Sequence, residues 1–318
     1  MAKRLDLAMR RDPFTLDESA CLQAAQELQR YKSEPYLSQG EDSREAAALF
    51  KLFFVAICHQ VNWDFLLGRM KERFYSPDPK EMILRALNCT ASDIEMLLDG
   101  YARPERIRAN ERAKILKETA SIIKDFSLND LTALLFPSSV EGAGGLIEQI
   151  NIFPAFSQDP VKKKSNVFAQ ELMRESIATF NDESRVQPAV DYHLIRLYLR
   201  TGRVVAKDAI VAEVFTSALP TRMRLITLLR KKVGEALALT AFYAKKTIFE
   251  VNYIEWQIAR QRCHSDQPNC TGPWDDLSFD SAVVAISATR CPYSHWCLAN
   301  NDPDWKALKE PEVRKAFY

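Results

Sequence analysis

Four cysteines near the carboxyl end of the chain constrain its fold more than any other feature. The chain has 318 residues, and these cysteines are Cys263, Cys270, Cys291 and Cys297, in the spacing Cys-x6-Cys-x20-Cys-x5-Cys. Four thiolates are the ligands that a [4Fe–4S] cluster needs. Structural zinc usually has closer Cys-x2–4-Cys pairs, so the pattern favours a cluster over zinc. The alternatives are a zinc site that includes His264 or His295 and a group of buried, unliganded thiols.

The composition and the hydrophobic pattern predict an all-α protein. Hydrophobic residues make up 47% of the chain, which is enough for a sizeable core, and only 9 residues are glycine. Apolar side chains recur at helical spacing, and the alternation typical of strands is nearly absent. We expect two helical lobes. Residues 1–43 are expected to pack with the C-terminal lobe, residues 44–204 to form the lobe that leads to Asp191, and residues 205–318 to form the C-terminal helices and the cysteine loop.

Local signals indicate where some helices begin and end. Thr15-Leu-Asp-Glu18 and Ser92-Asp-Ile-Glu95 have the pattern of a capping box, in which two side chains bond each other's backbone at a helix start. The helical pattern from Pro220 to about Arg262 is too long for one ordinary globular helix. It predicts two helices with a break between Lys245 and Asn252.

The sequence has no membrane or targeting signal. Its beginning lacks an apolar stretch of signal-peptide length, and no segment has about 18 uncharged apolar residues. We therefore expect a cytoplasmic protein without a membrane partner, whose cysteines are reduced. The formal net charge is +1. Any nucleic-acid surface must then be a local basic patch, because a nearly neutral chain has no strong overall field for a polyanion.

The segment Val190-Asp191-Tyr192-His193-Leu194-Ile195-Arg196 contains the candidate catalytic carboxylate. Pro188 suits the entry to a helix, so Asp191 is expected at the helix cap or in the first turn. The positive end of the helix dipole favours an ionised carboxylate there. Such a carboxylate can stabilise the sugar cation that forms when an N-glycosidic bond breaks. An ordinary helix cap is the alternative.

This segment and the cysteines together resemble the endonuclease III and adenine glycosylase type of helix-hairpin-helix DNA glycosylases. Residues 190–200 match the Val-Asp-x-His-x-x-Arg-x-x-x-Arg pattern of that family, and residues 253–263 are similar to the helix that enters its cluster loop. The family's loop is Cys-x6-Cys-x2-Cys-x5-Cys. The resemblance therefore implies a [4Fe–4S] cluster on the four cysteines, with residues 271–290 as an insertion. It also implies that Asp191 is catalytic.

Two features of that family are missing from the chain. The hairpin Leu-Pro-Gly-Val-Gly is absent, and residues 156–165 stand in its place. Members that also cleave the DNA strand have a lysine about 18 to 20 residues before the aspartate. Met173 stands at the start of that window here, and the nearest upstream lysine is Lys164. We therefore expect an abasic product without efficient strand cleavage, with Lys164 as the candidate for any amine chemistry.

Residues from about 55 to 204 are also similar to the queuosine salvage N-glycosidases, which are related to the DNA glycosylases. The motifs that carry this similarity are Val61-Asn-Trp-Asp-Phe65, Glu111-Arg-Ala-Lys-Ile-Leu-Lys-Glu-Thr119 and Asp191-Tyr-His-Leu-Ile-Arg196. His193 and the pair Ile195-Arg196 depart from that family's last motif. The similarity implies substrate contacts near the first and last motifs.

A flipped base needs an aromatic ring to stack on and polar groups for its edge. Residues 60–65 offer such a group, and Tyr192 and His193 lie next to Asp191. The candidate substrate-binding residues are Asn62, Trp63, Asp64, Tyr192 and His193. For residues 60–65, the end of a helix with a packed tryptophan is the alternative.

These patterns predict a DNA N-glycosylase that flips a modified or damaged base out of double-stranded DNA and excises it, in repair or in defence against modified foreign DNA. We expect a monomer that carries a [4Fe–4S] cluster, with Asp191 and Lys164 as the catalytic candidates. One alternative is a nucleoside or nucleotide N-glycosidase of the queuosine salvage type. The other is a non-catalytic iron–sulfur protein that binds DNA.

Overall fold

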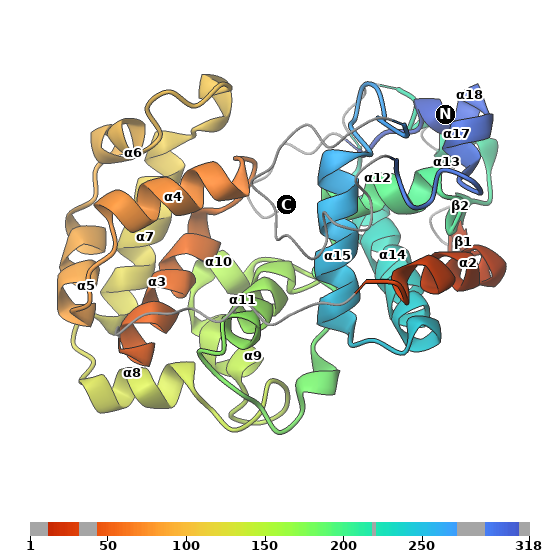
Figure 1. The fold of residues 1–318 in the computed structure, drawn as a ribbon. Helices are drawn as coiled ribbons and strands as arrows, with labels where there is room; N and C mark the ends of the chain where they lie inside the picture. Colours follow the sequence, from red (N-terminus) through yellow and green to blue (C-terminus); the bar gives the residue numbers. More distant parts are fainter. Residues whose placement is uncertain (1–11, 32–42, 218–220, 272–289, 312–318) are drawn as a thin grey trace. The chain divides into compact units, whose positions relative to one another are not determined.

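The computed structural model describes residues 12–31, 43–217, 221–271 and 290–311. Contacts between residues divide the described chain into two compact units. We call residues 43–186 the central unit, and residues 12–31 together with 187–311 the terminal unit. Both units are helical (Figure 1). Helix accounts for 61% and strand for 3%, which confirms the predicted all-α class.

Helix α3 (Arg44–Ile57) is the core element of the central unit. Eleven of its 14 residues are buried, because apolar side chains occupy nearly every face of the helix. The surrounding elements are α4 (Trp63–Arg73), α5 (Pro79–Asn88), α6 (Ala91–Leu97), α7 (Ala109–Ile123), α8 (Leu128–Leu135), α9 (Leu146–Gln149), α10 (Pro154–Ser157) and α11 (Lys163–Arg174), with 3-10 helices η1 (Pro104–Arg106), η2 (Ile150–Ile152) and η3 (Glu183–Arg185). Helices α5, α7, α8 and α11 contact α3 directly.

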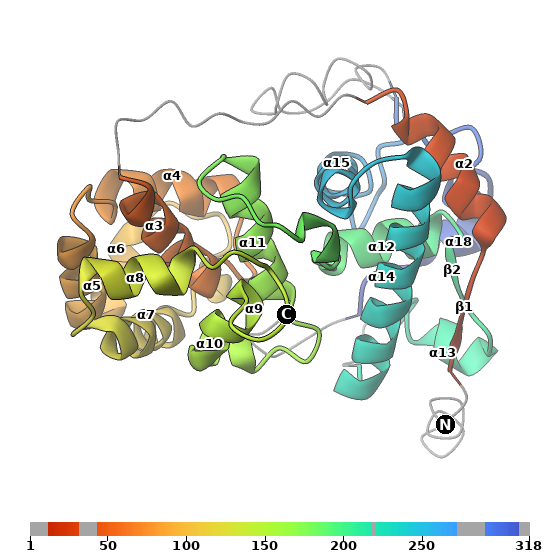
Figure 2. The same cartoon turned by 90° about the horizontal axis from the view of Figure 1, so that it is seen from below.

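The terminal unit joins the beginning of the described chain to its end. Its elements are β1 (Phe14–Leu16), α2 (Glu18–Leu28), α12 (Tyr192–Arg200), β2 (Val204–Ala206), α13 (Ala209–Glu213), α14 (Met223–Ala244), α15 (Ile248–Gln261), α17 (Leu298–Asn301) and α18 (Pro303–Ala307). Helix α2 packs along α14, as both views show (Figures 1 and 2). Strands β1 and β2 pair antiparallel, with Phe14 opposite Ala206. Helix α12 packs against α14 and α15.

The predicted division of the long helical run after Pro220 is confirmed. Helix α14 ends at Ala244, and Lys245 follows with a φ of 55° in the left-handed region. A capping box formed by Thr247 and Glu250 then starts α15. The break lies where two local signals coincide, a left-handed C-cap and a new N-cap.

Two predicted capping boxes are wrong in detail. Thr15 belongs to β1, and Asp17 caps α2 instead, with its Oδ1 accepting a hydrogen bond from the Ala20 amide at 2.9 Å. Near the second site the box is formed by Thr90 and Asp93, two residues earlier than predicted. The predicted helices were right in both places, but neighbouring polar side chains competed for the cap position.

The boundary between the two units differs from the predicted one. Residues 187–204 belong to the terminal unit, although the sequence pattern placed them in a lobe of residues 44–204. The helix that begins after Asp191 is therefore part of the same unit as the four cysteines. No described helix has both the length and the apolar character needed to cross a bilayer.

Candidate active site

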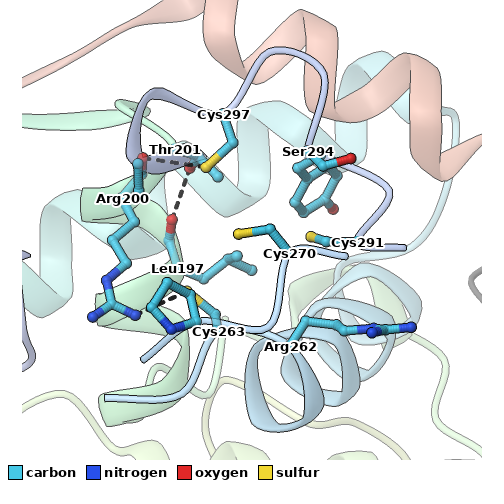
Figure 3. Close-up of a pocket in the computed structure, with 12 residues that line it drawn as sticks. Leu197, Arg200, Thr201, Arg262, Cys263, Cys270, Cys291, Ser294 and Cys297 are labelled. Atoms are coloured by element: carbon cyan, nitrogen blue, oxygen red, sulfur yellow. Dashed lines mark hydrogen bonds between the residues drawn. The ribbon is translucent and has the colours of Figure 1, made fainter. Parts of the chain in front are cut away.

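The four cysteines of the sequence pattern line one pocket in the terminal unit (Figure 3). Cys263 follows the end of α15, and Cys297 is the N-cap of α17. Cys263, Cys291 and Cys297 are buried, and Cys270 is half-buried. The other lining residues are Leu197, Arg200, Thr201, Arg262, Pro268, Tyr293, Ser294 and Ala299. All seven cysteines of the chain lie among the described residues, and none forms a disulfide.

The second and third cysteines, which are far apart in the sequence, lie side by side in the structure. The amide of Cys291 donates a hydrogen bond to the carbonyl of Cys270 at 3.0 Å. The next residues outward, Thr271 and Arg290, form an antiparallel bridge. Residues 272–289 lie outside the described residues. Cys270 and Cys291 are therefore neighbours, as expected if the segment between them is an insertion.

Helix α12 forms one wall of the cysteine pocket. Leu197, Arg200 and Thr201 line it. A guanidinium nitrogen of Arg200 lies 3.5 Å from the Cys263 sulfur, and the Cys297 thiol donates to the Arg200 carbonyl at 3.4 Å. Arg196 donates to the Cys263 carbonyl. The cysteine loop is thus fixed to the C-terminal half of α12 at several points.

Within the described residues, no group of three or more His, Cys, Asp or Glu side chains stands close enough together to hold a metal ion. Burial raises the pKa of Cys297 to about 11 and also raises that of Cys291, so both thiols are protonated at neutral pH.

Asp191 is the N-cap of α12 and is buried, with 7% of its surface exposed. Its Oδ1 accepts a hydrogen bond from the Leu194 amide at 3.0 Å. Its Oδ2 accepts one from the indole N–H of Trp256, on α15, at 3.1 Å. Arg260 stacks on the Trp256 ring, 4.6 Å from its centroid. The carboxylate is therefore held in one orientation by two helices.

Tyr192 and His193 form the first turn of α12, next to Asp191. Their ring centroids lie 4.1 Å apart, and both residues are half-buried. The His193 Nδ1 lies 3.1 Å from a guanidinium nitrogen of Arg196. The structure thus places these two predicted substrate contacts beside the predicted catalytic carboxylate.

The other predicted contacts lie in the central unit, at the start of α4. The expectation that residues 60–65 end a helix is wrong, because α3 ends at Ile57 and a new helix begins after Asn62. Asn62 accepts the Phe65 amide at 3.0 Å as the N-cap. Trp63 packs edge-on against Phe54, with centroids 4.4 Å apart. Asp64 is exposed in the first turn.

Lys164 lies in the first turn of α11 and is only 3% exposed. Its ammonium donates to the carbonyl of Ala56, near the end of α3, at 2.5 Å. Burial lowers the pKa of Lys164 to about 8, and the nearby positive charges of Lys163 and Arg112 add to this effect. The structure assigns Lys164 and Asp191 to different units.

The sequence patterns did not single out His59 or Arg112, which lie beside Lys164. His59 is 2% exposed and Arg112 is completely buried. A histidine directly after a long apolar run was the only sequence signal for His59. Arg112 belongs to a basic stretch in the sequence, and nothing there distinguishes it from the other members, Arg103, Arg106, Arg108 and Lys114.

A scan against protein-family models and a search of curated proteins each found no match to this chain. We therefore infer function from the residues and their geometry. Asp191 and the cysteine pocket lie in the terminal unit, and Lys164 and the start of α4 lie in the central unit.

Proposed function

We propose that this protein is a DNA N-glycosylase that excises a modified or damaged base and carries a structural [4Fe–4S] cluster. One observation supports the proposal above all others. Helix α12 has a buried, doubly hydrogen-bonded carboxylate at its N-terminus, Asp191, and a pocket lined by four cysteines along its C-terminal half. The same two elements, in the same order, occur in the endonuclease III type of glycosylase that the sequence resembles.

The proposed chemistry is hydrolysis of the bond between C1′ of the sugar and the base nitrogen. As the bond breaks, its electron pair leaves with the base and positive charge develops on the sugar. The Asp191 carboxylate stabilises that charge, because Leu194 and Trp256 fix its position before the reaction begins. Water then bonds to C1′, and its proton is released, while the departing base takes up a proton. Tyr192 and His193 are the nearest candidates to contact the nucleotide.

The proposed role of the cysteine pocket is to fix α12. A bound cluster would tie Cys263, Cys270, Cys291 and Cys297 together through iron–sulfur bonds. The links from the Arg200 and Arg196 side chains to Cys263 would transmit that rigidity to α12. A carboxylate that must stabilise a short-lived cation benefits from such a rigid support, because a misplacement of about 1 Å can cost a hundredfold in rate.

A nucleotide N-glycosidase of the queuosine salvage type is the second candidate. The net charge of +1 favours this candidate, because proteins that bind duplex DNA are usually more basic. The two candidates share the chemistry at Asp191 and differ in the substrate. A non-catalytic DNA-binding protein differs from both, because it would release no base.

The decisive experiment incubates the purified protein with genomic DNAs that carry different base modifications and identifies any released base by mass spectrometry. We expect one modified base to appear, together with abasic sites and without efficient strand cleavage. Parallel incubations with free nucleosides and nucleotides test the second candidate. Binding to duplex DNA should weaken steeply with salt if phosphates are neutralised. Release of no base from any DNA or nucleotide, with the protein folded and loaded with iron, would contradict the proposal.

A further inference from the structure

Three helix ends meet in the central unit around the last turn of α3. The carbonyl groups of α3 that have no partner in their own helix point toward α7 and α11, and accept hydrogen bonds from side chains of those helices. Helices α7 and α11 begin here, after Arg108 and Lys162, which both have left-handed backbone conformations. Helix α7 has no side-chain cap on its first amides. The first amide of α11, that of Lys163, instead donates to the buried carboxylate of Asp159 at 2.7 Å. The positive dipole end of α7 therefore presents uncapped amides at this place.

Two buried cations lie at this meeting point. Arg112 donates to the carbonyls of Ile57, at 3.2 Å, and of His59. Lys164 donates to the carbonyl of Ala56. Within the described part of the chain, neither cation forms an ion pair with a carboxylate. Burial lowers the pKa of Arg112 to about 10, as it lowers that of Lys164, because the nearby acidic groups offset the loss of solvation only in part.

Lys51, another buried lysine of the central unit, provides a comparison because it forms ion pairs. Its ammonium lies 2.8 Å from Glu171 and 2.6 Å from Glu175. Those carboxylates raise the pKa of Lys51 in spite of its burial. A buried charge without such a partner costs several kcal/mol, roughly the desolvation penalty of one ion. The fold pairs Lys51 with two carboxylates. For Lys164 and Arg112, the more distant carboxylates of Asp159 and Glu111 offset the burial only in part.

His59 adds an independent observation. Its ring is buried, and among the described residues neither ring nitrogen has a hydrogen-bond partner. The Nε2 lies 3.5 Å from Oε1 of Glu111, in the first turn of α7, and that oxygen also lacks a hydrogen bond. The other Glu111 oxygen pairs with Arg108 at 3.2 Å. A buried imidazole that makes no hydrogen bond is rare in a native structure, and a further polar group beside it would satisfy the ring.

We propose that Lys164, His59 and the N-terminus of α7 bind a phosphate group. A phosphate supplies further negative charge to Lys164, and its several oxygens can accept from the His59 ring and the free amides of α7 at once. Arg112 holds the three helix ends together and adds positive charge. Glu111 does not repel the anion strongly, because Arg108 neutralises it. The side chains of Arg108 and Glu111, at the start of α7, are 28% and 31% exposed.

The phosphate can come from a nucleic acid, a nucleotide or free phosphate, and the inference does not depend on base excision. The chain has only 4 histidines, so selective ¹⁵N labelling of histidine in the full-length, iron-loaded protein gives few ring signals. His59→Gln assigns the signal of interest. Inorganic phosphate, a nucleoside 5′-monophosphate and a short single-stranded oligonucleotide are then added separately to the wild-type protein. The unphosphorylated nucleoside is the control.

We expect the His59 ring signals to shift with the phosphate probes and to stay unchanged with the nucleoside. The probe that acts at the lowest concentration identifies the source of the phosphate. Lys164→Met should weaken binding of the nucleoside monophosphate roughly tenfold to a hundredfold, because a charge-assisted hydrogen bond is lost. Lys114→Met is the matched control, since Lys114 lies on α7 but is 74% exposed.

Two results would overturn the proposal. One is a His59 signal in the wild-type protein that none of the three phosphate probes moves at millimolar concentration. The other is an unchanged affinity for the nucleoside monophosphate in folded Lys164→Met. The titration of the His59 signal uses only the wild-type protein, so this test remains valid even if Lys164→Met fails to fold.

Discussion

The indole N–H of Trp256 donates a hydrogen bond to Oδ2 of Asp191 over 3.1 Å. Trp256 lies on α15, and Cys263 follows the end of that helix. The same helix therefore orients the candidate catalytic carboxylate and leads directly into Cys263, the first cysteine of the pocket. Helix α12 makes the second link, from Asp191 at its start to Arg200 beside Cys263. The carboxylate and the cysteine pocket are thus parts of one packed arrangement.

Trp256→Phe tests the positioning role of this bond. Phenylalanine keeps a ring beneath Arg260 but removes the N–H that Asp191 accepts. We expect the rate of base release in a single turnover to fall roughly tenfold, with substrate affinity nearly unchanged, because the carboxylate is less well fixed. Trp305→Phe, at a half-buried tryptophan of α18, is the matched control. Equal rates for wild-type protein and Trp256→Phe would show that this bond has no part in the reaction.

The cysteine pocket predicts a specific metal content. Protein purified without oxygen should be brown and contain about four irons per chain, the content of one [4Fe–4S] cluster. Changing any one of Cys263, Cys270, Cys291 or Cys297 to serine should lower the iron content and the yield of folded protein, because metal binding contributes to folding. Cys21→Ala and Cys89→Ala, at two buried cysteines outside the pocket, should retain full iron. One equivalent of zinc without iron would contradict the assignment.

The lowered pKa of Lys164 predicts a dependence of stability on pH. The unfolded chain keeps the lysine proton up to a pH of about 10.4, whereas the folded protein releases it near pH 8. The folded state therefore gains stability relative to the unfolded state as pH rises through this interval.

The gain should be absent in Lys164→Met. In phosphate-free buffer, the free energy of unfolding of the wild-type protein should rise relative to that of this variant between pH 8 and pH 10. The rise should be at most on the order of 3 kcal/mol. Denaturant unfolding at several pH values measures the difference, which cancels the titration of other groups. A difference that stays constant over this range would mean that Lys164 titrates normally.

A buried network behind the cysteine pocket predicts a large loss of stability. Glu255 and Arg203 are both completely buried, and their charged atoms lie 2.6 Å apart. Tyr293, in the cysteine loop, donates to Glu255 at 2.7 Å. Glu255→Gln leaves the Arg203 charge without a partner and should cost about 3 to 5 kcal/mol in the free energy of unfolding.

Tyr293→Phe is the matched comparison within this network. It removes one hydrogen bond and leaves the ion pair intact, so it should cost only about 1 to 2 kcal/mol. Thermal or denaturant unfolding of both variants measures the contrast. Similar losses in the two variants would show that the ion pair contributes little beyond its hydrogen bonds.

The parts of the fold that depend on nearby residues were predictable from the sequence. Asp191 caps α12 because a short polar side chain directly before a run of helical spacing suits the cap position. The break between α14 and α15 was also predictable, because the helical run exceeds the usual length. These signals lie within a few residues of the structure that they determine.

Other parts depend on contacts between distant segments. Thr15 lies in a strand because β1 pairs with β2, almost two hundred residues later. The adjacency of Cys270 and Cys291 depends on the bridge between Thr271 and Arg290, which spacing alone does not reveal. His59 meets Lys164 and Arg112 only because three helices converge there. Local periodicity contains no information about such pairings.

The most direct test of the central claim is the rate of base release by Asp191→Asn, on the substrate that the wild-type protein acts on. The amide keeps the side-chain shape and can still accept the Leu194 amide, but it lacks the negative charge and loses the bond from Trp256. Iron content, circular dichroism and substrate binding show whether the variant is folded and loaded. We expect all three to be nearly normal and base release to fall roughly a hundredfold to a thousandfold or more. A folded, iron-loaded Asp191→Asn that releases base at the wild-type rate would contradict the account.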